Sequence, residues 1–357
     1  MDLTTAGASQ KKIRVLVVDD SSLARKLIID GLSRYPRIEV AGYAINAVDA
    51  KNKFAQLNPD VMTLDVQMPG ISGMDFLKQF LPEHQLPVVL CSSLNIGVFD
   101  ALSAGAVDFV RKPDGTQGTE MFIKTLAQKI QIAATAKVQR HSYSERAAAA
   151  NTPTTIAPPP LGTSVRGQII IGLGASTGGT EATLEVLKRL PEDIPAMVIT
   201  QHMPTGFTKM YADRLNRLCK MEVREAQDGD ELKRGVAFIA PADLQMRVVR
   251  APLGGYRVEC KPGEKVSGHR PSVDALFYSM AENVQCKMAG IIMTGMGADG
   301  AKGLLEMRKK GAYTIGQDKE SSVVYGMPGV ANDIGAVMTQ ASCKDVAGVL
   351  LRHLKTL

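Results

Sequence analysis

The stretch IRVLVVDDSSLAR, residues 13–25, decides the fold of the first part of the chain, because a short apolar run ends directly in Asp19 and Asp20. A second apolar run ends in Asp65, and Lys112 follows a third. Short β-rich runs that alternate with helical patterns are typical of a parallel sheet covered on both faces. The carboxyl ends of such strands share one edge, so we expect three carboxylates and one ammonium group to meet there.

The alternation extends over residues 11–130, which we predict to form one α/β domain. Its expected strands are 13–18, 39–44, 60–65, 87–91 and 107–110, and its expected helices are 22–34, 47–57, 73–80, 96–104 and 119–134. This order predicts a doubly wound, flavodoxin-like domain with a five-stranded parallel sheet.

Three clustered carboxylates repel one another, so Asp19, Asp20 and Asp65 together predict a cation site. Oxygen-only ligands suit Mg²⁺, which also accepts a phosphoryl oxygen. Relieved of that repulsion, Asp65 becomes a suitable phosphoryl acceptor, so the domain is expected to be a phosphorylation switch. Taken singly, Asp20 could be a helix N-cap and Asp65 a turn residue, but the joint pattern favours the switch.

Three further residues are expected to complete the switch. Ser92 ends the next strand and can donate a hydrogen bond to a phosphoryl oxygen. Lys112 supplies a point charge to the same group. Phe109, shortly before Lys112, is placed to move inward when the Ser92 hydroxyl shifts.

Composition narrows the class of protein. The chain has 357 residues, 45% apolar and 22% charged, which is ordinary for a soluble protein with two domains. Its net charge of +6 is not concentrated in any one domain, so we expect no nucleic-acid partner. The five cysteines form no C-x-x-C pair, which indicates reduced thiols. We find no signal-peptide pattern or bilayer-spanning stretch, and therefore expect a cytoplasmic protein without membrane insertion.

The composition changes after the first domain. Residues 131–166 are rich in Ala, Ser, Thr and Pro and are predicted to be a flexible linker. Residues 167–357 then restart the alternation and predict a second, Rossmann-like α/β domain with a mainly parallel sheet. We expect its strands at 168–173, 196–200, 221–225, 236–240, 288–293, 312–316 and 335–338, a hairpin at 244–260, and helices at 178–189, 206–218, 273–284, 300–309 and 343–354.

A possible nucleophile lies in IIIGLGASTGG, residues 169–179, where G-x-S-x-G places Ser176 between a strand and a helix. A nucleophile elbow needs this context, and amides at the helix start can stabilise an oxyanion. Two alternatives are a glycine-rich turn with Ser176 as an N-cap and a dinucleotide-binding loop. The second is disfavoured because Thr177 stands where G-x-G-x-x-G has its third glycine.

Two other residues strengthen the hypothesis that Ser176 is a catalytic nucleophile. His202 follows the next expected strand, and Asp299 follows a later one within TGMGADG. Asp299 can orient His202, which can then deprotonate Ser176. The chain order Ser, His, Asp differs from that of the α/β-hydrolases, so their fold is not implied.

The motifs VLVVDDSSLAR, LDVQMPGISGMDFL and FVRKP make residues 11–130 resemble a response-regulator receiver domain. GASTGG, QHMPTGFT, HRPSVDALF, TGMGADG and GMPGVA make the whole chain resemble the chemotaxis protein-glutamate methylesterase/protein-glutamine glutaminase family, CheB. The resemblance implies a triad of Ser176, His202 and Asp299, an oxyanion contact from the Met296 N–H and a supporting Thr177. One departure is that Gln67 and Ser72 stand where receivers usually carry acidic residues.

The same resemblance implies the activity and partners. The enzyme would hydrolyse glutamate methyl esters on chemoreceptor helices and deamidate certain glutamines, with no cofactor for that step. A chemotaxis histidine kinase would phosphorylate Asp65 with Mg²⁺, and this would uncover the active site. Two other classes remain open at this point: an adaptor without catalysis, and a nucleotide-binding oxidoreductase. The second rests on two glycine-rich loops, the one around Ser176 and residues 295–300, which formally match G-x-G-x-x-G.

Overall fold

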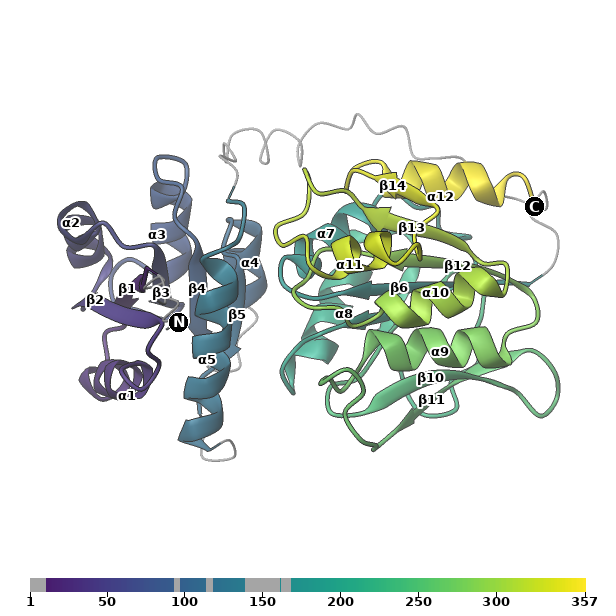
Figure 1. Ribbon diagram of the computed structural model, residues 1–357, viewed down its shortest axis with the longest axis horizontal. Coiled ribbons are helices and arrows are strands. Elements are labelled where there is room, and N and C mark those ends of the chain that lie inside the picture. The colour runs from purple at the N-terminus through teal and green to yellow at the C-terminus, as the bar shows by residue number, and fades with distance from the viewer. Residues whose placement is uncertain (1–10, 93–96, 114–117, 139–160, 162–167) are drawn as a thin grey trace, which may run out of the picture. The chain divides into compact units, whose positions relative to one another are not determined.

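The fold was analysed in a computed structural model that describes residues 11–92, 97–113, 118–138, 161 and 168–357. The chain divides into two units, Met1–Arg146 and Ala147–Leu357 (Figure 1). Most of the predicted linker, residues 139–160 and 162–167, lies outside the described residues. None of the helices in the described ranges combines the length and the apolar character needed to cross a membrane.

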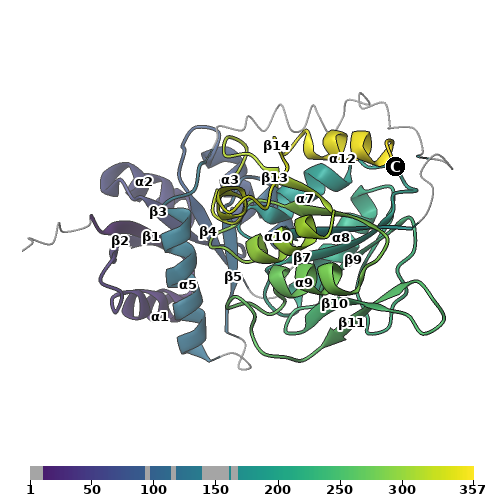
Figure 2. The ribbon, with the colours of Figure 1, turned by 45° about the vertical axis from the view of Figure 1, so that its right-hand side comes forward.

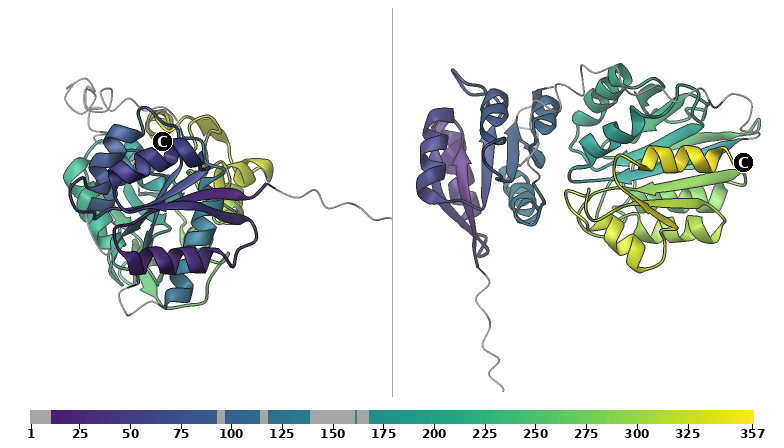
Figure 3. Two further views of the ribbon diagram at one scale, coloured as in Figure 1. Left: turned by 90° about the vertical axis from the view of Figure 1, so that its left-hand side faces the viewer. Right: turned by 90° about the horizontal axis from the view of Figure 1, so that it is seen from above.

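The first unit is a five-stranded parallel sheet in the order β2-β1-β3-β4-β5. Helices α1 and α5 cover one face, and α2, α3 and α4 cover the other (Figures 1 and 3). The strands are β1 (Ile13–Val18), β2 (Ile38–Ala44), β3 (Val61–Asp65), β4 (Val88–Ser92) and β5 (Asp108–Arg111). The helices are α1 (Ser22–Leu32), α2 (Ala47–Leu57), α3 (Gly73–Phe80), α4 (Gly97–Ser103) and α5 (Thr119–Ala133). The predicted doubly wound fold is confirmed.

Local sequence explains where these elements lie. Strands β3 and β4 are buried along their whole length, which is why they read as unbroken apolar runs. Ser21, Asn46 and Ser72 begin α1, α2 and α3, and each side chain accepts the backbone N–H three residues on. The three helices therefore start directly beside the carboxyl edge of the sheet.

The second unit has a seven-stranded parallel sheet in the order β14-β13-β12-β6-β7-β9-β8 and an antiparallel hairpin, β10–β11. Its strands are β6 (Ile169–Ala175), β7 (Ala196–Gln201), β8 (Glu222–Glu225), β9 (Val236–Ile239), β10 (Gln245–Arg250), β11 (Tyr256–Lys261), β12 (Lys287–Ile292), β13 (Tyr313–Gln317) and β14 (Thr339–Ala341). Its helices are α7 (Gly179–Leu187), α8 (Phe207–Leu218), α9 (Val273–Asn283), α10 (Ala301–Lys309), α11 (Met327–Asp333) and α12 (Val346–Leu354).

Helices also cover both faces of this second sheet. Helices α9, α10 and α11 pack together on one face, and α7, α8 and α12 pack on the other (Figure 2). A large part of the core lies between the sheet, α9 and the hairpin, and includes Phe238, Phe277 and Met280. The predicted Rossmann-like domain with a mainly parallel sheet is confirmed.

The strand predicted at 335–338 is wrong. Helix α11 ends at Asp333, Gly335 has a φ of 73°, and the Ala336 N–H donates to the Ala331 carbonyl at 2.8 Å. These contacts complete the helix end, so the edge strand forms later, at Thr339–Ala341. The prediction also missed α11 itself, which starts with proline in its first turn, where a missing N–H costs nothing.

Gly174, on the central strand β6, allows α9 to pack close to the sheet. A Cβ at this position would lie 2.1 Å from Cγ1 of Val273, the first residue of α9. Because Val273 is β-branched and stiff, it cannot move aside without moving the start of the helix. The contact therefore requires glycine at this point of the strand.

We predict that Gly174→Ala lowers the unfolding free energy of the second unit by about 1–3 kcal/mol, the usual cost of overpacking a core. Calorimetric unfolding of the full chain would measure the change. Gly263→Ala is the matched control, since its Cβ would make an ordinary 3.6 Å contact with Gln245. Equal stability of the two variants would contradict the packing argument.

Candidate functional site

The carboxyl edge of the first sheet brings together the acidic residues expected there. Asp19 and Asp65 are buried, whereas Asp20 is exposed. One oxygen from each of the three carboxylates can be chosen so that all lie within 4.8 Å of one another. The Lys112 ammonium lies 2.7 Å from Oδ2 of both Asp19 and Asp65. The two strand ends and the loop after β5 therefore form one charged cluster.

Burial controls the electrostatics of this cluster. Desolvation raises the pKa of Asp65, although hydrogen bonds from Lys112 and from the Gln67 N–H favour its ionised form. For Lys112, desolvation alone would lower the pKa, but its bonds to Asp19 and Asp65 outweigh that effect and raise it. Burial disfavours the ionised form of Asp65, and the ligands that the three aspartates offer are all oxygen atoms. This combination fits a hard cation such as Mg²⁺.

The other expected switch residues lie beside the cluster. Ser92 is buried at the end of β4. Phe109 is also buried, and its ring centroid is 6.4 Å from that of Phe99 on α4, so the ring already lies inside the domain. Ser72, where a receiver usually has an acidic residue, is the N-cap of α3 and contributes no charge.

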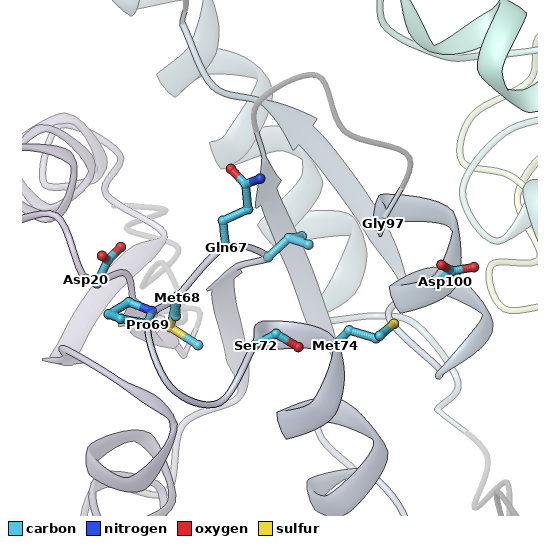
Figure 4. A pocket seen from close by; sticks show the side chains of 9 residues that line it. Asp20, Gln67, Met68, Pro69, Ser72, Met74, Gly97 and Asp100 are labelled. Atoms are coloured by element: carbon cyan, nitrogen blue, oxygen red, sulfur yellow. The ribbon is translucent and has the colours of Figure 1, made fainter.

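A hollow of about 590 Å³ is lined in part by the residues that directly follow Asp65 in the sequence. Figure 4 shows Gln67, Met68 and Pro69 of the β3–α3 loop on its wall, with Asp20 on one side and Asp100 of α4 on another. Both Asp20 and Asp100 are exposed. The loop that directly follows Asp65 therefore borders a hollow with two exposed carboxylates.

In the second unit, the polar groups gather where the strand order reverses. Strand β6 pairs with β7 on one side and with β12 on the other, and the chain winds away from this point in both directions. Open α/β sheets bind ligands in the crevice at such a point. Ser176 follows β6, His202 follows β7, and Asp299 lies in the loop after β12.

The turn that carries Ser176 is fixed by neighbouring strands. The Ser176 N–H donates to the Thr294 carbonyl at 3.0 Å, so it is not available to a ligand. The Ser176 carbonyl accepts the Gly179 N–H at 2.7 Å and the Gln201 amide at 2.8 Å. Gly178, with a φ of 76°, reverses the chain into α7. The predicted strand–turn–helix context is present.

His202 and Asp299 contact each other directly. Nε2 of His202 lies 2.7 Å from Oδ2 of Asp299, and both side chains are almost completely buried. Nδ1 of His202 is also buried and has no hydrogen-bond partner in the described ranges. Because the Asp299 carboxylate accepts hydrogen bonds, Nε2 carries the proton and Nδ1 has its lone pair free.

The first turn of α9 holds the Asp299 carboxylate. Oδ1 accepts the Ser272 hydroxyl at 2.7 Å and the Asp274 N–H at 2.9 Å, and Oδ2 accepts the Val273 N–H at 2.8 Å. Burial alone would raise the pKa of Asp299, but its bonds to His202 and to the helix start outweigh burial and lower it. The carboxylate is therefore ionised and fixed in orientation.

The remaining expected residues also lie in this region. Thr177 is buried directly after Ser176. Met296 lies in the loop after β12, where Gly295 approaches Ser176 so closely that a Cβ would be 2.7 Å from the Ser176 Cβ. No hydrogen bond from the Met296 N–H to another described residue is present. The Met296 N–H therefore remains a candidate donor to an external oxygen.

Sequence families agree with this two-part arrangement. The family described as CheB methylesterase matches residues 171–350, and the response regulator receiver domain matches residues 15–122. The chain is 47% identical over 350 residues to protein-glutamate methylesterase/protein-glutamine glutaminase 2 of Syntrophomonas wolfei, covering 97% of this chain and 99% of that protein.

The chain belongs to the CheB methylesterase family.

Other CheB relatives are consistent with this assignment. An Escherichia coli protein-glutamate methylesterase/protein-glutamine glutaminase is 41% identical over 349 residues, 96% of this chain and 97% of the relative. The crystal structure of the Thermotoga maritima CheB methylesterase catalytic domain aligns with a TM-score of 0.50 at 34% identity, covering 53% of this chain and 100% of that one. The second unit therefore shares the fold of a CheB methylesterase catalytic domain.

Three residues at the CheB site were missed by the sequence analysis. Ser272 binds Asp299, Gln201 binds the Ser176 carbonyl, and the His269 ring stacks on His202 at 3.9 Å. Gln201 and His269 belong to the motifs QHMPTGFT and HRPSVDALF, but neither motif indicates what these side chains contact. A serine directly before an expected helix was the only usable signal for Ser272.

The raised pKa of Asp65 leads to a prediction about stability. An Asp whose folded pKa lies above its ordinary value costs stability above the folded pKa; the cost shrinks as the pH falls below the folded pKa and is gone below the ordinary value. Asp65→Asn should therefore make the first unit more stable than the natural chain at pH 7 without divalent cations, and the difference should shrink in acid. Thermal unfolding followed by circular dichroism between pH 3 and pH 8 would measure it.

Asp100→Asn is the control for that measurement, because Asp100 is exposed on α4. A gain of the same size in the control would show that general charge reduction, and not the burial of Asp65, causes the effect.

Proposed function

We propose that this chain is a phosphorylation-activated hydrolase that removes methyl groups from glutamate methyl esters on chemoreceptors, and deamidates certain glutamines there. The observation that carries the proposal is the 2.7 Å contact between His202 and Asp299, at the strand reversal that also positions Ser176. Membership of the CheB methylesterase family supports the reaction class and the substrate. A histidine and an ionised carboxylate next to a serine are the parts that acyl transfer requires.

In the proposed reaction, Ser176 Oγ attacks the ester carbonyl while His202 Nδ1 takes its proton. Asp299 holds the other ring nitrogen and stabilises the imidazolium that forms. The tetrahedral intermediate collapses when His202 returns the proton to the methoxy oxygen, and methanol leaves. Water then attacks the glutamyl ester of Ser176 in the same way and restores the hydroxyl. With glutamine, ammonia leaves in place of methanol.

The oxyanion of this intermediate is proposed to accept the Met296 N–H. That amide has no described acceptor, whereas the Ser176 amide is occupied by Thr294. Thr177, which is buried directly after Ser176, is proposed to support the turn. Preorganised amides of this kind typically contribute about 10²–10³ to the rate. No cofactor is assigned to the ester step.

The first unit is proposed to be the switch that regulates this reaction. Asp65 accepts the phosphoryl group from a chemotaxis histidine kinase, and Asp19, Asp20 and Asp65 would hold Mg²⁺. The cation, when bound, supplies positive charge that offsets repulsion between these carboxylates and the incoming phosphate. Ser92 and Lys112 then bind the phosphoryl oxygens, and Phe109 responds to the displaced hydroxyl. We assign the chain to the cytoplasm, with the cytoplasmic helices of chemoreceptors as its substrate.

The catalytic assignment predicts that Ser176→Ala lowers methanol release from methylated receptor membranes by about a thousandfold or more, as when a triad nucleophile is lost. His202→Ala should be comparably severe, and Asp299→Asn similar or milder, since it disturbs the imidazole and leaves the nucleophile intact. Ser342→Ala, in the loop before α12, is the matched control and should retain full activity. Near-normal turnover of Ser176→Ala would remove Ser176 from the mechanism.

The switch assignment predicts that labelling of Asp65 by a small phosphodonor requires Mg²⁺ or Mn²⁺, because uncompensated carboxylates repel a phosphate dianion. The same donor should increase methanol release by the natural chain, but not by Asp65→Ala. Basal esterase activity should persist in excess EDTA. Full labelling in EDTA, or undiminished labelling of Asp65→Ala, would contradict the assignment.

A further inference from the structure

His269 contacts both His202 and Asp299, yet the proposed reaction gives it no role. Its ring lies parallel to that of His202, with the centroids 3.9 Å apart and the planes inclined by 6°. Its Nδ1 lies 3.8 Å from Asp299 Oδ2, the same oxygen that His202 contacts. The His269 side chain is 42% exposed and that of His202 is 9% exposed. The stack thus consists of an outer ring and an inner ring.

The segment that carries His269 is held firmly. Val266 and His269 exchange two backbone hydrogen bonds across a turn in which Ser267 and Gly268 have φ values of 49° and 81°. Positive φ at both central residues is the pattern of a type I′ hairpin turn. The Ser267 hydroxyl donates to Asp274 Oδ2 at 2.7 Å, and Nδ1 of His269 donates to the Ser267 carbonyl at 2.8 Å. The ring orientation is therefore fixed by the fold.

A shared metal ion is a poor explanation for this pair of rings. Nitrogen and oxygen atoms of His202, His269 and Asp299 do lie within 4.8 Å of one another. However, a metal-bound imidazole directs its lone pair in the plane of its ring, and two parallel rings 3.9 Å apart cannot both aim at one ion in this way. In addition, Nδ1 of His269 already donates to a carbonyl.

We infer that His269 is a positioning residue that stabilises the protonated form of His202 during acyl transfer. The inference rests on the proposed function. When His202 accepts the Ser176 proton it becomes a cation, and the face of an aromatic ring within about 6 Å attracts a cation. Because His202 is positively charged only while the tetrahedral species forms and collapses, the contact assists that stage more than substrate binding.

The experiment measures methanol release by the full chain, activated with a phosphodonor and Mg²⁺, over a range of methylated receptor membrane concentrations. His269→Ala should lower kcat about threefold to thirtyfold, the range of cation–π contacts from exposed to desolvated sites, with little change in KM. His269→Phe keeps a flat ring without titratable nitrogen and should recover most of the lost kcat. The partly exposed position makes both replacements tolerable to the fold.

His353→Ala is the matched control, because the His353 ring also stacks on an aromatic ring, Tyr313, with centroids 4.0 Å apart. It should retain the natural kcat. An unchanged kcat in His269→Ala, a change confined to KM, or a His269→Phe variant as slow as His269→Ala would overturn the inference alone. If the natural chain releases no more methanol than Ser176→Ala, the proposed function fails and the inference fails with it.

Discussion

The candidate site in the second unit depends on one interaction, the hydrogen bonding of the Asp299 carboxylate by the first turn of α9. Two helix amides and the Ser272 hydroxyl fix both oxygens of the carboxylate before His202 contacts it. The carboxylate in turn fixes which nitrogen of His202 bears the proton. The position of α9 itself depends on the close approach of Val273 to Gly174. A helix packed on the central strand thus sets the protonation pattern of the site.

Each unit has a buried aspartate with a shifted pKa, and the two shifts are in opposite directions. Asp65 is buried, the Gln67 N–H is its single backbone donor among the described residues, and burial raises its pKa in spite of Lys112. Asp299 is buried with several donors, and their combined effect lowers its pKa. A carboxylate whose charge is poorly compensated suits a site that binds cations and phosphate reversibly. A carboxylate whose charge is fully compensated, such as Asp299, suits a permanent structural role in the site.

The fold and most of the candidate site could be predicted because the relevant residues follow buried strands. Ser176, His202 and Asp299 each come after an apolar run, and parallel strands place such positions along one edge. Ser272 and His269 could not be found this way, because they act through loop contacts that depend on how β12 and α9 pack. The misplaced strand near the C-terminus has a similar cause. The apolar residues 336–338, which follow α11, resemble a strand when their backbone partners are unknown.

The strand order also has a consequence for the order of events during synthesis. Strand β6 is central and emerges early in the second unit, but its neighbour β12 emerges more than a hundred residues later, at Lys287–Ile292. Until then one edge of β6 has no partner, and the Thr294 carbonyl that anchors Ser176 has not left the ribosome. Domains fold as units while the chain elongates. A growing chain therefore carries Ser176 and His202 long before Asp299 is made, and the complete site can form only near the end of translation.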